Sequence, residues 1–151
     1  MPIVFEDAVS KDISSGKFAP VYLLFGEDAF LKKHFFDRIC NKAYGGGPFF
    51  NLQKFEGDAE LQDVYDAVKQ FPMMADTKCV TLTDYDFEHA SKTDLEKLCT
   101  LLSEGEEGCV LVVRFDSIEF DSKRSAKAKK LLEAVEKGGG MAVQLELRKP
   151  A

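Results

Sequence analysis

The sequence of 151 residues lacks the features that place a protein in or across a membrane. No apolar run in it approaches the roughly 20 residues that a transmembrane helix needs. The N-terminus also lacks the basic stretch followed by an apolar stretch that marks a secretory signal. We therefore expect a cytoplasmic protein with no membrane partner.

The chain has few of the side chains that build metal or nucleophilic sites. Its four cysteines are widely spaced, form no C-x-x-C pair and have no nearby histidine with which to bind zinc. The two histidines, His34 and His89, have no evident catalytic partner. Three of the cysteines fall within apolar stretches, so we expect buried, reduced thiols and no metal. The cysteines are Cys40, Cys79, Cys99 and Cys109.

Positive charge is in the minority, because 20 lysines and arginines stand against 26 aspartates and glutamates, for a formal net charge of -6. This balance argues against affinity for nucleic acid or anionic membrane across the whole surface. One predicted helix nevertheless concentrates basic residues, which we interpret as a solvated face, with a phosphate-tracking surface as the alternative. Its basic residues are Lys123, Arg124, Lys127, Lys129 and Lys130, and all except Lys129 are candidates to face DNA.

Apolar residues make up 45% of the chain and charged residues 30%, which is an ordinary balance for one globular domain spanning residues 1–151. Strand-like and helix-like patterns alternate along it. Strands are predicted at residues 21–25, 52–56, 79–83, 109–115 and 141–147. Helices are predicted at residues 4–15 and 28–44, between Asp58 and Pro72, from Ser91 or Thr93, and from Asp121 or Ser122 up to Gly138.

This alternation predicts an α/β protein with three layers, in which helices cover both faces of a parallel five-stranded sheet. The first and fourth strands are continuous apolar runs, which is typical of central strands. The second and fifth are polar or alternating, as expected of edge strands. The strand order itself stays open, because both common five-stranded orders place the second and fifth strands outside.

The stretch "GEDAFLKK" at residues 26–33 follows the first predicted strand and resembles the phosphate-binding P-loop pattern G-x-x-x-x-G-K-[ST]. Gly26 and Lys32 stand where that pattern needs them. Leu31 replaces the second glycine, whose small size lets the backbone approach phosphate, and Lys33 replaces the hydroxyl that would bind magnesium. Glu27 adds negative charge. We therefore favour a plain strand-to-helix turn, with a nucleotide-binding ATPase as the alternative.

Acidic residues also collect at the carboxyl ends of the predicted strands, where sheets of this type place their sites. Glu27 and Asp28 follow the first strand, Asp84 the third, Ser117 the fourth and Lys149 the fifth. Two carboxylates, an acceptor aspartate and a lysine would suit a phosphate-accepting domain of the bacterial receiver type. The spacings are longer than in that fold, so acidic loops at strand ends are the preferred interpretation.

The stretch "KQFPMMADTK" places Met73 and Met74 between a proline that ends a helix and the start of the third strand. One interpretation is a methionine pair packed beneath the rim of the sheet. The other is an exposed pair of flexible apolar side chains, a common arrangement at surfaces that bind partners.

Three stretches, "PVYLLFGEDAFLKKHFFDRI", "AVKQFPMMADTKCVTLTDYD" and "CVLVVRFDS", together resemble the N-terminal domain of the delta subunit of the bacterial DNA polymerase III clamp loader. The resemblance covers residues 5–147. It implies an AAA+-type fold with the fourth strand beside the first, and a P-loop position that has lost its nucleotide, hence no cofactor. Asp84 would occupy the Walker B position, but Tyr85 follows it in place of the catalytic glutamate, and Asp116 would occupy a sensor position.

In this family, an apolar pair after the helix that precedes the third strand enters a pocket on the β sliding clamp. The resemblance therefore assigns Met73 and Met74 to clamp binding. The family pair is often a leucine with an aromatic residue, and a methionine pair departs from that pattern. Phe71 is a second candidate for the aromatic position, which leaves the register of the anchor open by two residues.

The resemblance further implies a non-catalytic subunit of a DNA-directed DNA polymerase (nucleotidyltransferase) holoenzyme, which opens the clamp ring for loading onto DNA during replication. The implied partners are the β sliding clamp and the other loader subunits, gamma/tau and delta prime, with DNA contacted weakly or indirectly, in the bacterial cytoplasm. Lid and collar domains are expected beyond residue 151.

Overall fold

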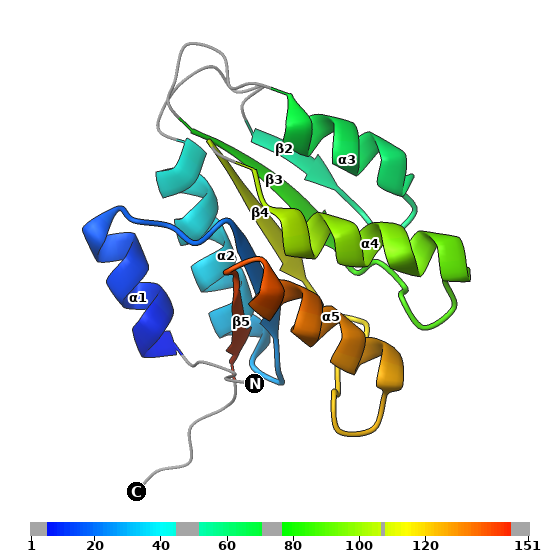
Figure 1. Ribbon diagram of the computed structural model, residues 1–151. Coiled ribbons are helices and arrows are strands. Elements are labelled where there is room, and N and C mark those ends of the chain that lie inside the picture. The colour runs from blue at the N-terminus through cyan, green and yellow to red at the C-terminus, as the bar shows by residue number, and fades with distance from the viewer. Residues whose placement is uncertain (1–5, 45–51, 71–76, 107, 146–151) are drawn as a thin grey trace, which may run out of the picture.

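The computed structural model describes residues 6–44, 52–70, 77–106 and 108–145, and in these ranges helices and strands alternate (Figure 1). The helices are α1 (Glu6–Ser15), α2 (Ala29–Tyr44), α3 (Leu61–Lys69), α4 (Lys92–Glu104) and α5 (Ala126–Lys137). The strands are β1 (Val21–Phe25), β2 (Leu52–Phe55), β3 (Lys78–Thr83), β4 (Cys109–Arg114) and β5 (Met141–Gln144). None of the helices in these ranges is long and apolar enough to cross a membrane.

The strands form one parallel sheet in the order β2-β3-β4-β1-β5. β4 therefore lies beside β1, with Val21 opposite Leu111, as the resemblance implied. The prediction that the second and fifth strands form the edges is confirmed. Every residue of β1 and β3 is buried, because helices cover both faces of the central strands.

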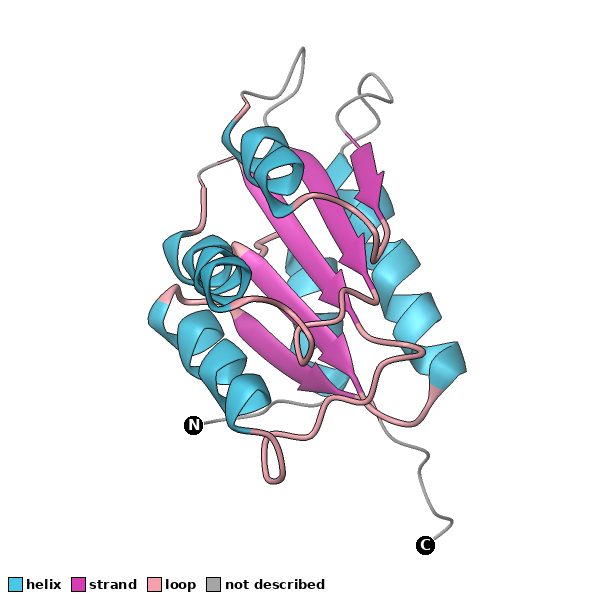
Figure 2. Ribbon diagram, turned by 90° about the vertical axis from the view of Figure 1, so that its right-hand side faces the viewer, coloured by secondary structure: helices cyan, strands magenta, loops and turns pink. Residues whose placement is uncertain are grey.

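The side chains of each strand alternate between two hydrophobic clusters, because successive residues of a strand point to opposite faces of the sheet. Tyr22 and Leu24 of β1 pack with α1 and α2 on one face. Leu23 and Phe25 pack with α3, α4 and α5 on the other. Figure 2 shows the sheet as the middle layer with helices at both sides, so the predicted three-layer architecture is confirmed.

Two predicted helix starts are wrong. Asp58 does not cap α3, which begins at Leu61 after Glu60 without a side-chain cap. Neither Asp121 nor Ser122 begins α5, whose N-cap is Ser125. The Asp121 carboxylate instead accepts the backbone N–H of Lys123 and folds its own turn, a local alternative that aspartate offers the backbone. Of the two candidates for the cap of α4, the structure selects Ser91.

The cysteines are free thiols, and Cys40, Cys79 and Cys109 are buried, as predicted, whereas Cys99 is half-buried. The Sγ atoms of Cys40 and Cys79 lie 3.6 Å apart between α2 and β3. Their hydrogen bond, together with burial, raises the pKa of Cys79 well above its usual value. These thiols therefore act as small apolar side chains of the core.

Candidate functional site

The carboxyl edge of the sheet, where the strand arrowheads end in Figure 1, carries a groove of about 440 Å³. The loops that follow β1 and β4 line it, at residues 25–27 and 115–123, together with Gln144 at the end of β5. A parallel sheet of this type places ligands at this edge. Gly26, Glu27 and Ser117, which were predicted from the P-loop pattern and the acidic constellation, line this groove.

Gly26 approaches the chain's own backbone. It has a φ of +121°, and a Cβ atom added there would lie 2.2 Å from the Leu145 carbonyl oxygen. The Asp28 N–H donates to the same carbonyl at 3.0 Å, and the Asp28 carboxylate caps α2 by accepting the Leu31 N–H. The loop is therefore packed against the chain beyond β5. In a P-loop the corresponding backbone would face phosphate.

The other predicted residues of this loop also have structural roles. Leu31 is half-buried and packs against the cluster beneath α1 and α2. Lys33 is exposed and forms an ion pair with Asp37 one turn later, at 2.9 Å. Glu27 is exposed beside the groove. This arrangement agrees with the predicted strand-to-helix turn.

Lys32, which stands at the position of the P-loop lysine, is only 3% exposed. Its Nζ donates a hydrogen bond of 2.9 Å to the carbonyl of Phe115, just after β4, and lies 3.5 Å from the Asp116 carboxylate. The ammonium group that a nucleotide-binding relative would direct at phosphate is thus bound by the chain itself. A buried ammonium needs such partners, because burial without them is strongly unfavourable.

Asp84, for which the resemblance implied the Walker B position, holds the turn that follows β4. Its Oδ1 accepts the backbone N–H groups of Asp116, Ser117 and Ile118, at 2.6, 2.9 and 3.4 Å. Its φ of +56° is in the left-handed region, which aspartate tolerates better than most residues. Three converging N–H groups usually bind an external anion. Here the anion is a side chain of the same protein.

Asp116 joins these two contacts into one cluster. One carboxylate oxygen faces Lys32, and the other lies 3.0 Å from Nε of Arg114. The Arg114 guanidinium in turn lies over the Phe36 ring of α2, 4.1 Å from its centroid. We call Lys32, Asp84, Arg114 and Asp116 the carboxyl-edge cluster. It unites Lys32, Asp84 and Asp116, which the sequence suggested separately, with Arg114, and its charged groups are paired within the chain.

The alternative of a receiver-like site gains no support from this geometry. Asp84 and Asp28 are engaged with backbone N–H groups, and Lys149 lies outside the described residues. Within the described ranges, no three carboxylate, histidine or cysteine side chains group as metal ligands. Ser117 contributes its backbone N–H to the Asp84 contact.

Two of the basic residues of α5 and the loop before it contact Asp121 and the backbone of Glu88. Arg124 pairs with Asp121 at 3.6 Å, and Lys127 donates to the Glu88 carbonyl at 2.5 Å. Lys123 and Lys130 are exposed. A DNA-facing role for these residues remains a prediction, and two of the four have partners within the chain.

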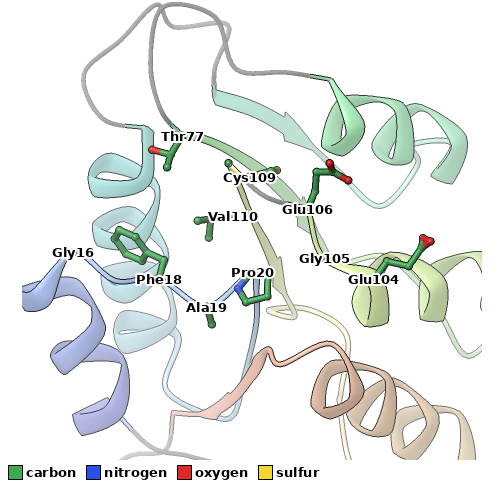
Figure 3. Close-up of a pocket in the computed structure, with 11 residues that line it drawn as sticks. Gly16, Phe18, Ala19, Pro20, Thr77, Glu104, Gly105, Glu106, Cys109 and Val110 are labelled. Carbon is green, nitrogen blue, oxygen red and sulfur yellow. The ribbon is translucent and has the colours of Figure 1, made fainter.

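The amino edge of the sheet carries a second groove, of about 400 Å³ (Figure 3). Phe18 and Pro20, from the segment before β1, lie on one side of it. Glu104, at the end of α4, and Glu106 lie on the other. Thr77, immediately before β3, completes the lining next to α2.

The predicted clamp-binding residues Phe71, Met73 and Met74 lie outside the described residues, between α3 and Thr77. The chain on both sides of them is described. Before them, Lys69 pairs with Glu106 at 3.0 Å. This hydrogen bond is the main cause of the raised pKa of Lys69.

After these residues, Thr77 donates from Oγ1 to the Ala43 carbonyl at 2.5 Å, and the Lys78 N–H donates to the Gly108 carbonyl at 2.8 Å. The Lys78 side chain turns back into the protein, is 3% exposed and donates from Nζ to the Ala67 carbonyl in the last turn of α3. Burial lowers the pKa of Lys78. Sequence reasoning missed this residue, because a lysine that starts an apolar strand is usually its solvated end.

Comparison with known proteins agrees with this fold. The sequence matches the family described as DNA polymerase III, delta subunit, over residues 22–137. No curated protein sequence matches the chain.

Two solved structures are similar. The first is the Bacillus subtilis DNA clamp loader delta protein, with a TM-score of 0.75 and 19% identity, covering 95% of this chain and 43% of that one. The second is a Thermotoga maritima protein related to the gamma subunit of DNA polymerase III, with a TM-score of 0.61 and 14% identity, covering 95% of this chain and 46% of that one. This chain thus spans less than half the length of either structure.

At these identities the structural likenesses concern the fold, and they confirm the predicted α/β architecture with a parallel five-stranded sheet. The family match extends from the second residue of β1 to the last residue of α5 and includes the P-loop-like turn and the carboxyl-edge cluster. The chain belongs to the DNA polymerase III delta subunit family.

Proposed function

We propose that this chain is the part of a clamp loader delta subunit that binds the β sliding clamp and helps to hold its ring open for loading onto DNA. Membership of the delta subunit family over residues 22–137 is the observation that carries the proposal. The structural likeness to the Bacillus subtilis DNA clamp loader delta protein supports it at the level of the fold.

The proposed anchor is the methionine pair Met73 and Met74, with Phe71 as a neighbouring candidate. Methionine side chains are unbranched and flexible, so they adapt to the shape of a partner's pocket. Each one fully buried in such a pocket contributes about 1.5–3 kcal/mol. The ties of Lys69 and Thr77 support this assignment, because they fix the chain on both sides of the pair.

Ring opening follows from binding only if the subunit prefers the open clamp. A binder shifts an equilibrium between two states by its difference in affinity for them and by no more. Two or three apolar anchors would supply part of that difference. The proposed mechanism is therefore mechanical and needs no bond to be made or broken by this chain.

We propose that the chain neither hydrolyses nor binds ATP. In support, the Lys32 ammonium and the Asp84 carboxylate, the two groups that would face phosphate and magnesium, are bound within the chain. In the full-length protein we expect lid and collar domains to follow residue 151 and to join gamma/tau and delta prime. DNA would be contacted weakly or indirectly.

The test is a titration of the Met73→Ala/Met74→Ala double variant with the sliding clamp of the same organism. Two lost anchors should weaken binding by about a hundredfold or more. Met141→Ala is the control, since it makes the same substitution at a half-buried methionine of the edge strand β5, which β4 and β1 separate from β3. Undiminished affinity of the double variant would show that the anchor is assigned to the wrong residues.

A further inference from the structure

Lys78 is an unusual residue for the position it occupies. Its neighbours in β3 are buried, and its own side chain is 3% exposed, yet it ends in an amine. Burying an amine is unfavourable unless it is hydrogen-bonded. An apolar side chain of similar length would occupy the same space without that penalty, and such replacements are often neutral or stabilising. Stability alone therefore does not account for a lysine here.

The contact of the Lys78 amine suggests what it does. The acceptor, the Ala67 carbonyl, is one of the last four of α3, which lack the hydrogen-bond partner available within a helix. A cation at this end of a helix also interacts favourably with the helix dipole. The side chain thus joins the last turn of α3 to the first residue of β3.

These are the two elements that flank residues 71–76, the segment assigned to clamp binding. The backbone of Lys78 is itself fixed, because its N–H donates to the Gly108 carbonyl beside β4. The Lys69 ammonium makes a second, outer tie to Glu106, in the turn between α4 and β4. Both ends of the segment are therefore held to one edge of the sheet, at positions 69 and 78.

We propose that Lys78 is a positioning residue for clamp binding, which fixes the separation and direction of the two ends of the segment that carries the anchor, with Lys69 as the outer tie. The proposal rests on the proposed function. Its physical basis is preorganisation: a segment whose ends are held in place before binding loses less conformational freedom when it binds. Removing the tie lowers the affinity without removing any group that contacts the clamp.

The central experiment compares Lys78→Met with the parent protein in a clamp titration, at a temperature where both are fully folded. Methionine keeps most of the side-chain volume but cannot donate to Ala67. The expected result is a loss of affinity of about tenfold, part of which comes from slower association. The Lys69 side chain is 33% exposed, so Lys69→Met should fold normally. Its affinity for the clamp should fall about threefold.

A matched control separates positioning from stability. Val9→Ala removes buried volume on α1, in the cluster on the opposite face of the sheet from α3, and should lower the melting temperature without changing affinity. Equal losses of affinity in Val9→Ala and Lys78→Met would overturn the proposal, because the effect would then follow stability. Unchanged affinity in Lys78→Met would overturn it directly. If Lys78→Met does not fold, unchanged affinity in Lys69→Met overturns it.

The Met73→Ala/Met74→Ala variant distinguishes the proposed anchor from the proposed positioning role of Lys78. If that variant keeps full affinity, the proposed anchor is wrong. If it loses affinity while the Lys78 and Lys69 variants keep theirs, the anchor stands and the positioning role is rejected.

Discussion

The two edges of the sheet differ in what their polar residues hold. At the carboxyl edge, the ammonium of Lys32 and the carboxylate of Asp84 bind groups of the turn after β4. At the amino edge, Lys69 and Lys78 stand on the two sides of the segment proposed to bind a partner, and they bind Glu106 and the Ala67 carbonyl. Charged groups at the first edge are thus occupied by hydrogen bonds within the chain. At the second edge they tie the described residues on either side of residues 71–76 to the rest of the chain.

At the carboxyl edge, the two charged groups that a nucleotide site would use are bound within the chain. A P-loop would direct a lysine such as Lys32 at phosphate, and a Walker B aspartate at the position of Asp84 would bind magnesium. Both groups form hydrogen bonds within the chain, and these bonds hold the turn after β4 without a ligand. If this interpretation is correct, substitutions at the carboxyl edge should act on stability, and those at the amino edge on binding.

The largest stability effect is expected for Gly26→Ala. The added Cβ would lie 2.2 Å from the Leu145 carbonyl oxygen, in a backbone conformation with φ of +121° that alanine rarely adopts. We expect a loss of about 3 kcal/mol in the free energy of unfolding, measured by urea denaturation.

Gly139→Ala is the matched control, because Gly139 also has a positive φ, +77°, but nothing lies within 4 Å of the added atom. Its free energy of unfolding should fall by about 1 kcal/mol, from backbone strain alone. If the two variants lost the same free energy of unfolding, the close approach of the Gly26 loop to Leu145 would not contribute to the effect of Gly26→Ala.

Asp84→Ala should have the next largest effect. It removes the acceptor of three backbone N–H groups, two of which belong to exposed residues that water can reach. We therefore expect a loss of about 2 kcal/mol, again by urea denaturation. Asp84→Asn keeps an acceptor oxygen and tolerates the positive φ, so it should lose less than half as much. A loss as large in Asn as in Ala would point to the negative charge itself.

The order of the elements could be predicted from the sequence, because apolar periodicity reports burial directly. The apolar runs of β1 and β4 marked the central strands, and the polar character of β2 marked an edge. The starts of α3 and α5 were missed for a local reason. Asp58 and Asp121 are residue types that serve equally as helix caps and as turn formers, and the sequence does not distinguish these roles.

The candidate site was predictable in its residues but not in its contacts. Leu31 and Lys33 break the P-loop pattern visibly. What Lys32 binds instead depends on a carbonyl 83 residues away, and what Asp84 binds depends on N–H groups 32 or more residues away. Such pairings follow from the strand order, in which β4 lies between β3 and β1. The sequence left that order open before the resemblance was considered.

The amino edge should be sensitive to alkaline pH through Cys109, which begins β4 and lines the groove there. Burial raises the pKa of this thiol from 9.0 to about 11. The folded protein therefore keeps a proton that the unfolded chain releases above pH 9, so stability is fully present below pH 9 and falls between pH 9 and 11. The thiol should account for a fall of about 2 kcal/mol across this window.

Cys109→Ala isolates this contribution. The variant should be less stable at neutral pH because buried volume is lost, but its stability should fall less steeply between pH 9 and 11. Urea denaturation at several pH values measures both. Parallel curves for parent and variant would contradict the assignment of the alkaline loss to Cys109.

The smallest expected effect belongs to the carboxyl edge and is the absence of a response to nucleotide. A ligand that binds only the folded state raises the melting temperature as its concentration exceeds its dissociation constant. Because Lys32 is committed to Phe115 and Asp116, and Asp84 to the turn after β4, magnesium-ATP at millimolar concentration should leave the melting temperature unchanged. Lys32→Met provides the control, since a nucleotide site of the P-loop kind would lose its response in that variant. A rise in the parent that Lys32→Met abolishes would show that the carboxyl edge still opens to phosphate, and would replace the contrast between the two edges with two working sites on one sheet.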